Sequence, residues 1–390
     1  MSEWKKVRLG EIANYVNEKI DIKAFDTSLY INTDSMLKDK GGIGTPESIP
    51  ESGKVTKYQH NDILVSNIRP YFKKIWFSNR EGGCSNDVLV FRANDNIDST
   101  FLYYVLSDDS FFDHMMSSAN GTKMPRGNRK LIPYFEIPLP PLSTQHRIAS
   151  ILSRYDSLIK NYQKQIKLLE EAAQRLYKEW FVDLRFPGHE NTKIVDGVPE
   201  GWEKKKVNSI IELQSGFAFK SSTFDDNGAY KIVTIKNVKD GAFDGDNVSK
   251  IVAIPDKMPK HCILADGDIL LSLTGNVGRV CIVNGKNYLL NQRVAKLATG
   301  FKAFTYCLFR SRDMFIEVNN LADGAAQQNV SPIKIGEMKI LLPNSKLLQE
   351  FESIVFKSIA RIISLQSQIR LLTEARDRLL PKLMSGEIEI

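Results

Sequence analysis

The chain has 390 residues, of which 42% are hydrophobic and 25% are charged, and its formal net charge is +7. This length predicts two or three domains that each bury a core, and the composition is that of an ordinary globular protein. No apolar run approaches the roughly 18 residues of a membrane span, and the four cysteines neither form a CxxC motif nor lie at metal-ligand spacing from the five histidines. We therefore expect a reduced, cytoplasmic protein, whose basic excess permits a nucleic-acid partner and equally fits a protein without one.

Residues 1–142 combine short strand-like runs with a helical stretch. Runs such as KKIWFS (73–78) and DVLVFRA (87–93) are divided by Gly, Asn, Asp and Pro, and residues 100–119 have helical spacing of apolar side chains. This mixture predicts an α/β (α+β) domain.

Two stretches of this first domain are candidates for DNA contact. SNIRPYFKKIW (66–76) interleaves basic and planar side chains, which suit phosphate contact and stacking, and GTKMPRGNRK (121–130) is basic in a region without any acid. A half-buried strand in the first case and a surface loop without readout in the second are the alternatives. The candidate residues are Asn67, Arg69, Lys73, Lys74, Lys123, Arg126, Asn128, Arg129 and Lys130.

Residues 143–185 predict a long helix. From Ile148 to Trp180 the apolar positions alternate in steps of four and three, a heptad seam that favours packing on another helix rather than on a single domain. Residues 186–200 then form a linker.

Residues 201–345 predict a second α/β domain with its own candidate loops. TGNVGRV (274–280) is glycine-rich, and GAAQQNVSPIK (324–334) is rich in amides, whereas the first domain offers arginine and lysine. Amide side chains suit adenine, and basic ones suit guanine. The candidates are Thr274, Asn276, Arg279, Gln327, Gln328 and Asn329, and plain turns are the alternative.

Residues 346–390 predict a second long helix and a tail. Its seam is less regular, because Ser358 and Arg376 occupy apolar positions, and Pro381 is expected to end or kink the helix. Since Lys178 stands where Pro381 would fall, we expect the first helix to run longer. The predicted seam residues of the two helices are Leu152, Ile159, Ile166, Leu169 and Leu176, and Val355, Ile362, Ile369, Leu372 and Leu379.

The chain is an internal repeat. LLEEAAQRL (168–176) returns as LLTEARDRL (371–379), 203 residues later, and NDILVSN (61–67) resembles GDILLSL (267–273) at an offset of 206. Two pseudo-twofold-related globular domains, separated by an antiparallel two-helix coiled coil, fit this layout.

No catalytic motif is found. The sequence lacks the [DNS]PP[YFW] motif of adenine methyltransferases, a G-x-G-x-x-G loop and a Walker A loop, and the PD (255–256) and EMK (337–339) pair lies too far apart to suggest a nuclease site. We expect a binder without a metal or cofactor of its own.

Several segments resemble a known family. EIPLPPLSTQHRIASIL (136–152), AAQRLYKEWFVDLRFPG (172–188), VPEGWEKKKV (198–207) and RDRLLPKLMSGEI (376–388) are similar to the specificity subunit of type I restriction–modification systems. ILVSNIRPYFKKIWFS (63–78), TGNVGRV and NQRVAKL (291–297) resemble its target-recognition domains, and the last adds Gln292 and Arg293 to the candidates.

The resemblance implies a non-catalytic subunit that reads double-stranded DNA. Each target-recognition domain (1–142 and 201–345) would read half of an asymmetric bipartite site, at a separation set by the helices. The helices would dock DNA adenine methyltransferase subunits, which use S-adenosylmethionine, and a restriction (translocase) subunit would use ATP with Mg. A coiled-coil scaffold that joins proteins without DNA readout is the alternative, and a nuclease in its own right is a third reading.

Overall fold

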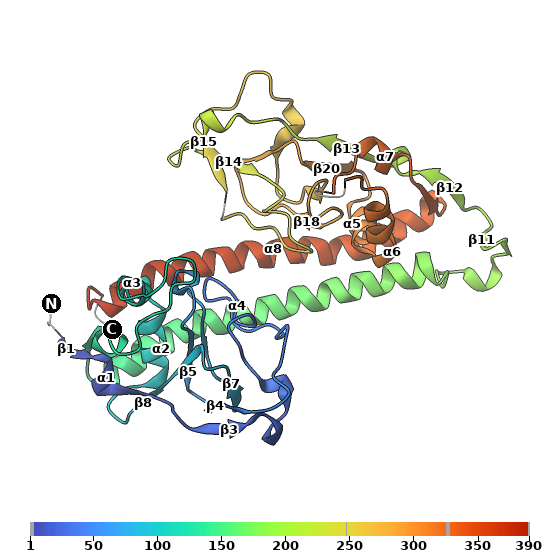
Figure 1. Cartoon of the computed structure of the whole chain (residues 1–390). Helices are drawn as coiled ribbons and strands as arrows, with labels where there is room; N and C mark the ends of the chain where they lie inside the picture. Colours follow the sequence, from blue (N-terminus) through green and yellow to red (C-terminus); the bar gives the residue numbers. More distant parts are fainter. Residues whose placement is uncertain (1–3, 247, 325–327, 389–390) are drawn as a thin grey trace. The chain divides into compact units, whose positions relative to one another are not determined.

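The computed structural model describes residues 4–246, 248–324 and 328–388. The chain divides into two compact units: unit 1 contains the residues up to Ile159 and those from Leu372 onward, and unit 2 is Lys160–Leu371. Both long helices therefore contribute residues to both units (Figure 1). None of the described helices is long and apolar enough to cross a membrane.

Unit 1 is built from antiparallel sheets with helices packed on them. One sheet has the strand order β2 (Ala13–Tyr15), β8 (Val88–Ala93), β5 (Ile63–Ser66) and β6 (Ile75–Phe77). A second sheet has the order β3 (Lys19–Asp21), β4 (Lys54–Tyr58) and β7 (Gly82–Cys84). Strands β1 (Lys5–Arg8) and β9 (Glu136–Leu139) form a separate pair. Its shorter helices are α1 (Leu9–Ile12), α2 (Ser99–Ser107) and α3 (Asp109–Ser117), with 3-10 turns η1 (Ile22–Ala24), η2 (Thr27–Leu29), η3 (Pro70–Phe72) and η4 (Ile132–Tyr134). The helical stretch predicted at 100–119 is thus two helices, because Asp108 caps α3 by accepting a hydrogen bond from the Ser110 amide.

Unit 2 has the same plan with additional strands. One sheet has the strand order β13 (Ile211–Ser215), β20 (Val294–Thr299), β17 (Ile269–Ser272) and β18 (Val280–Ile282). A second sheet has the order β15 (Ser249–Ile251), β14 (Tyr230–Val233), β19 (Tyr288–Leu290) and β16 (Ile263–Leu264). Two further pairs are β12 (Glu203–Lys206) with β21 (Lys339–Leu342), and β10 (Ile194–Val195) with β11 (Val198–Pro199). Strands β14 and β19 pair in parallel. Its shorter helices are α5 (Lys302–Arg310), α6 (Arg312–Asn320) and α7 (Pro332–Gly336), with 3-10 turns η6 (His189–Asn191), η7 (Val207–Ser209), η8 (Ser221–Thr223) and η9 (Lys260–Cys262).

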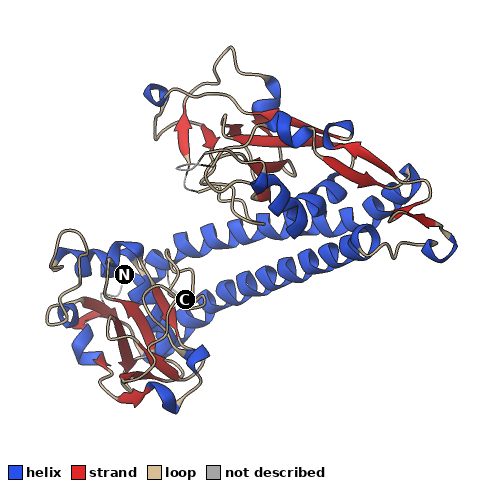
Figure 2. Cartoon of the chain, turned by 45° about the vertical axis from the view of Figure 1, so that its right-hand side comes forward, coloured by secondary structure: helices blue, strands red, loops and turns tan. Residues whose placement is uncertain are grey.

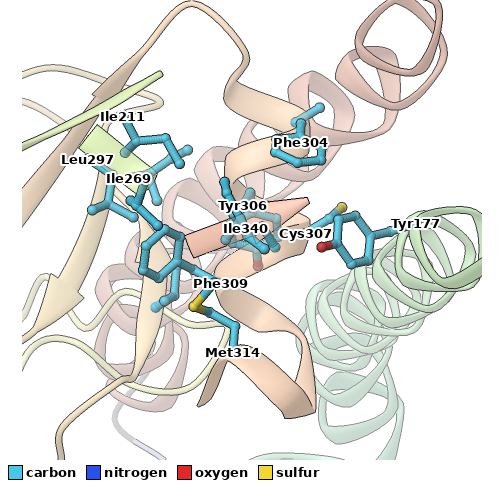
Figure 3. Close-up of a cluster of buried hydrophobic side chains, with 14 of the residues drawn as sticks. Tyr177, Ile211, Ile269, Leu297, Phe304, Tyr306, Cys307, Phe309, Met314 and Ile340 are labelled. Atoms are coloured by element: carbon cyan, nitrogen blue, oxygen red, sulfur yellow. The ribbon is translucent and has the colours of Figure 1, made fainter. Parts of the chain in front are cut away.

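The central strands explain how each core is divided. In β5, Ile63 and Val65 enter the cluster that includes α2 and α3, whereas Leu64 enters a separate cluster with Tyr58, since successive strand residues point to opposite faces. In β17, Ile269 and Leu271 likewise enter one cluster and Leu270 another. Figure 3 shows the larger cluster of unit 2, in which Ile269 and Leu297 lie on the sheet side and Phe304 and Tyr306 come from α5. Each central strand is therefore buried on both faces.

The elements of the two units correspond in chain order. The starts of corresponding elements are 198 residues apart at β1 and β12, 206 apart at β5 and β17, and 203 apart at α2 and α5. The predicted mixed α/β class and the internal repeat are confirmed, and the changes in spacing show that the two units differ in length within their strand-rich parts.

The two long helices run antiparallel. Helix α4 (Leu142–Tyr177) continues into a π-helical turn, η5 (Lys178–Val182), and α8 spans Ser345–Met384. Within unit 1, Ile148 near the start of α4 shares a cluster with Leu383 near the end of α8. Within unit 2, Tyr177 and Trp180 near the end of α4 contact the ring of Phe351 near the start of α8. The two ribbons are visible in Figure 2, and the predicted antiparallel packing of the two helices is confirmed.

The predicted seam residues differ in burial along the helices. Those that are buried are Leu152, Ile159, Val355 and Ile362. Those that are partly exposed are Ile166, Leu169, Leu176, Ile369, Leu372 and Leu379. In each helix the predicted seam is therefore buried in its N-terminal half and partly exposed in its C-terminal half.

The ends of the two helices refine the prediction. Pro381 does not end α8, which continues to Met384, because Leu383 and Met384 are buried in the unit 1 core and their packing outweighs the one backbone hydrogen bond that a proline removes. The first helix continues past Lys178, but as a π-helical turn: its α-helical part ends at Tyr177, and the turn that follows brings Trp180 and Phe181 into the core of unit 2.

Candidate nucleic-acid interface

In unit 1 the candidate residues lie on three neighbouring loop segments. We call residues 66–74, 85–87 and 120–130 face 1. The Asn67 amide donates to the Asp87 carbonyl (2.8 Å), the Arg69 amide to the Pro125 carbonyl (2.7 Å), and the Gly127 amide to the Asn67 carbonyl (3.2 Å). The loop at 120–130 is closed on itself by two bonds between Asn120 and Arg126, both of 3.0 Å. The structure thus brings together the two separate stretches that the sequence singled out.

Arg69 has an unusual backbone for a residue that is not glycine. Its φ of 51° and ψ of 62° are left-handed, and the Nε atom is buried without a hydrogen-bond partner in the described structure. Beside it, the Asn67 side chain is only 5% exposed, and its Oδ1 atom also has no partner there. Such local strain and unsatisfied polar atoms cluster at functional sites, where a ligand completes the bonding.

Several basic groups of face 1 are already paired within the protein. Arg126 forms an ion pair with Asp87 (3.3 Å), and Lys73 forms one with Asp109 (2.7 Å), which Lys40 also contacts (3.2 Å). Burial would raise the pKa of Asp109, but Lys73 and Lys40 hold that pKa below its ordinary value. These ion pairs hold the lysine and arginine side chains in place, so not all of the basic charge of face 1 is available to a polyanion.

Lys74 is held in a different way. Its Nζ donates to the Thr33 carbonyl (2.5 Å), and the ammonium lies over the Phe72 ring at 5.9 Å. Burial lowers the pKa of Lys74, and the nearby charges of Lys38 and Arg69 add to this effect. Lys74 therefore supports the loop more than it faces outward.

The outer part of face 1 is exposed and basic. Lys123, Arg129 and Lys130 are exposed, Asn128 is half-buried and accepts from the Lys130 amide, and Arg129 donates to the Asn86 carbonyl. The exposed apolar side chains Tyr71 and Met124 lie on the same segments. Sequence patterns did not point to Asp87. The repeat does make Asp87 the counterpart of Arg293 in unit 2, and Arg293 is one of the candidates.

Unit 2 repeats this arrangement bond for bond. We call residues 272–279, 291–293 and the described part of 323–330 face 2. The Leu273 amide donates to the Arg293 carbonyl (3.0 Å), the Gly275 amide to the Gln328 carbonyl (2.8 Å), and the Val330 amide to the Leu273 carbonyl (2.9 Å). Asp323 and Asn329 close the outer loop by two bonds of 2.9 Å. Each of these bonds joins the residues that correspond, in the repeat, to the bonded residues of face 1.

The side chains on this common frame differ. Gly275 (φ 73°) occupies the left-handed position that Arg69 holds in face 1, and Asn329 replaces Arg126. Thr274 is buried, and its Oγ1 donates to the Asn329 Oδ1 at 2.6 Å. The exposed candidates are Asn276, Gln292, Arg293, Gln328 and Asn329, Arg279 is half-buried, and Gln327 lies outside the described residues.

Potential metal ligands are scattered in the described parts of both units. Across the part of the chain that the structure describes, no three His, Cys, Asp or Glu side chains come together as a potential metal site. The free cysteines are buried, and burial raises the pKa of the Cys84 thiol to about 12.

Comparison with known proteins assigns the fold to a family. A family model described as the type I restriction modification DNA specificity domain matches residues 1–171 and again residues 199–372. The MjaVIII type I restriction enzyme specificity subunit of Methanocaldococcus jannaschii is 28% identical over 409 aligned residues, which cover 100% of this chain and 93% of the relative. The HindI specificity subunit of Haemophilus influenzae is 24% identical over 464 aligned residues, which cover 100% of both chains.

A solved structure has the same fold. The S subunit of a type I restriction-modification system from M. genitalium matches with a TM-score of 0.60 at 18% sequence identity, covering 97% of this chain and 96% of that chain. The family model spans most of the sequence and recurs in the same order as the two structural repeats. The chain therefore belongs to the family of type I restriction–modification specificity subunits and carries their DNA specificity domain twice.

Proposed function

We propose that the chain is a non-catalytic subunit that reads one asymmetric, bipartite site in double-stranded DNA. Segments 1–142 and 201–345 act as the two target-recognition domains, face 1 reads one half-site, and face 2 reads the other. The observation that carries the proposal is the common main-chain frame of the two faces, on which Arg69 and Arg126 in one unit are replaced by Gly275 and Asn329 in the other. Arginine suits the acceptors of guanine and the phosphates, whereas asparagine suits adenine, so the two faces favour different sequences.

The long helices serve this function as a spacer and as docking surfaces. Both α4 and α8 run from one unit into the other, so their length affects the distance between half-sites. Leu168 and Leu371 occupy the same repeat position, and each is 54% exposed. Two exposed leucines at equivalent positions fit symmetric docking of DNA adenine methyltransferase subunits. S-adenosylmethionine would bind on those subunits, and ATP with Mg on a restriction subunit.

Exchange of one outer loop tests the proposal. Replacing residues 121–130 by 324–333 in the full chain should change one half of the site that is methylated in a host, and leave the other half as it was, because the frame that holds the loop is the same in both units. Methylation mapping of the host genome, with and without the chain and its modification subunits, is the measurement.

Two other results would contradict the proposal. A change in both half-sites would show that the units do not read separately. Binding that is absent, or insensitive to salt, with the modification subunits present would favour the protein scaffold, since phosphate contacts make DNA affinity fall steeply with salt.

A further inference from the structure

A partly buried polar cluster joins the two long helices in unit 1. Arg376 of α8 donates from Nη1 to the Asp156 Oδ1 of α4 at 2.7 Å, and the Tyr104 hydroxyl of α2 donates to the Asp156 Oδ2 at 2.7 Å. The side chains of Arg376 and Asp156 are 24% and 19% exposed. The arginine that interrupts the apolar seam in the sequence is therefore one half of an ion pair across the helices.

The same three positions in unit 2 are apolar. The repeat places Cys307 at the position of Tyr104, Ile359 at that of Asp156, and Ala173 at that of Arg376. All three side chains are buried in one hydrophobic cluster. Figure 3 shows Cys307 of α5 beside Tyr177 of α4 in this cluster. The helix pair thus contains one polar site and one apolar site at equivalent positions.

This difference matters because most other seam positions are alike in the two helices. Corresponding seam positions are apolar in both α4 and α8, as in Ile148 and Phe351, Leu152 and Val355, Ile159 and Ile362, Ile166 and Ile369, Leu169 and Leu372, and Leu176 and Leu379. Apolar residues of similar size discriminate weakly between partners. In a second copy of the chain, α4 would therefore find another α4 with an apolar stripe comparable to that of α8. In the same way, α8 would find another α8.

The Asp156–Arg376 contact forms only when α4 pairs with α8, although Arg376 also donates to Asp377 of its own helix from Nε (2.9 Å) and Nη2 (2.8 Å). Antiparallel pairing of α4 with a second α4 would place Asp156 against Ala173, and pairing of α8 with a second α8 would place Arg376 against Ile359. A partly buried carboxylate that loses its cationic partner is unfavourable, so the α4 pair loses most through Asp156, whereas Arg376 keeps Asp377 in an α8 pair. A second polar contact joins α4 to unit 2, where the Glu170 carboxylate accepts from the Tyr306 hydroxyl at 2.7 Å. The counterpart of Tyr306 in unit 1 is Tyr103, so an α4 pair would offer Glu170 another tyrosine. This contact therefore does not distinguish α4–α8 pairing from self-pairing.

We infer that the Asp156–Arg376 ion pair selects the pairing of α4 with α8 against self-pairing of either helix with a second copy of the chain. One charged pair among apolar seam positions sets which helices associate, as polar seam residues do in coiled coils. The inference concerns assembly of the chain and does not depend on DNA binding.

A nicked full chain tests the selection. A protease site is inserted between Asp196 and Gly197, which form the exposed turn between β10 and β11. The intact chain is purified and cleaved, and isotopically labelled and unlabelled preparations are mixed until the halves have exchanged. Native mass spectrometry then counts pairs of first half with second half and pairs of like halves.

The wild-type chain should give at least a tenfold excess of unlike pairs over like pairs. The variant D156I/R376A copies the apolar site of unit 2 into unit 1, and like pairs should increase at least tenfold. The reversed variant D156R/R376D should keep the excess of unlike pairs, because either self-pairing still strands a charge. D156N/R376Q, which removes the charges with little change of volume, serves as the second variant and should also lose selection.

Retention of unlike pairs in both D156I/R376A and D156N/R376Q would overturn the inference. A lower melting temperature with no change in the ratio of unlike to like pairs would also overturn the inference. It would show that the ion pair contributes to stability and does not select the pairing. Loss of selection in D156R/R376D would also contradict it, because that variant keeps opposite charges on the two helices.

Discussion

At the residue scale, Arg69 combines backbone strain with an unsatisfied side chain. The left-handed conformation costs a residue with a Cβ roughly 1–2 kcal/mol, and the corresponding residue of unit 2 is Gly275, which adopts it without that cost. Unit 1 keeps an arginine at this position, and its Nε lacks a partner in the described structure. The combination favours a role in contact with a ligand rather than in stability.

Arg69→Gly should separate binding from folding. Its free energy of unfolding should stay within about 1 kcal/mol of wild type, because relief of the left-handed strain offsets the backbone entropy that glycine loses on folding. DNA affinity in the complex with modification subunits should fall about tenfold, as expected for loss of one arginine contact. Chemical denaturation and equilibrium DNA binding measure the two quantities.

Asn61→Gly provides a matched control. Asn61 is also left-handed (φ 69°) and lies in unit 1 between β4 and β5, outside face 1. The control should leave DNA affinity unchanged. An affinity loss in Arg69→Gly no larger than in Asn61→Gly would remove Arg69 from the interface.

At the element scale, α5 is capped by another helix. Glu352 of α8 accepts from the amides of Ala303 (2.9 and 3.0 Å) and Phe304 (3.1 Å), and α5 has no side-chain cap of its own. In unit 1 the matching helix α2 is capped by Asp98, which accepts from the Phe101 amide at 2.7 Å. The two units therefore satisfy the same helix end by different routes.

Glu352→Ala should lower the free energy of unfolding by about 2 kcal/mol, because it leaves buried amides at the start of α5 without an acceptor. Glu350→Ala, which removes an exposed carboxyl in the same turn of α8, should change stability by less than about 0.5 kcal/mol. Thermal or chemical unfolding of the two variants is the measurement. Equal losses would show that the cap does not stabilise α5.

The Glu352 carboxyl also predicts a dependence on pH. Burial raises the pKa of Glu352 above its ordinary value of 4.5, although the amides of α5 act in the opposite direction. As pH rises through this window, the unfolded chain loses the proton first, so ionisation reduces stability. The difference in the free energy of unfolding between wild type and Glu352→Gln should therefore favour wild type most below pH 4.5, and it should shrink above that pH.

At the scale of the whole molecule, α4 and α8 each contribute to both units, so a change in their length affects the two units together. Seven residues added after Lys160 in α4 and after Leu371 in α8 lengthen each helix by about 10 Å and nearly preserve the seam. The gap in the DNA site should increase by about three base pairs, at about 3.4 Å each, without a change in either half-site. Methylation mapping measures the gap.

Five residues inserted at the same places provide the control. They turn the seam by about 140°, so the helices should no longer pair along the same stripe. This variant should lose methylation. An unchanged gap after the seven-residue insertion would show that the helices do not set the spacing.

The parts of this fold that follow from local patterns were predictable. The heptad seam and the repeat at 203 residues indicated two matched domains and an antiparallel helix pair, because periodicity needs only neighbouring residues. The two faces depend on bonds between distant segments, such as Asn67 with Asp87 and Arg69 with Pro125, and these leave no local signal. Arg376 was interpreted as a defect of the seam because its partner, Asp156, lies 220 residues away along the chain.

The five matched bonds of each face are made by main-chain atoms. A peptide group offers the same donor and acceptor whatever side chain it carries, so the attachment of an outer loop does not constrain its chemistry. Arg126 and Asn329 illustrate this freedom within one molecule. Recombination or point mutation in one loop thus has a route to a new target without a matching change in the scaffold, and a restriction specificity can diversify one half at a time.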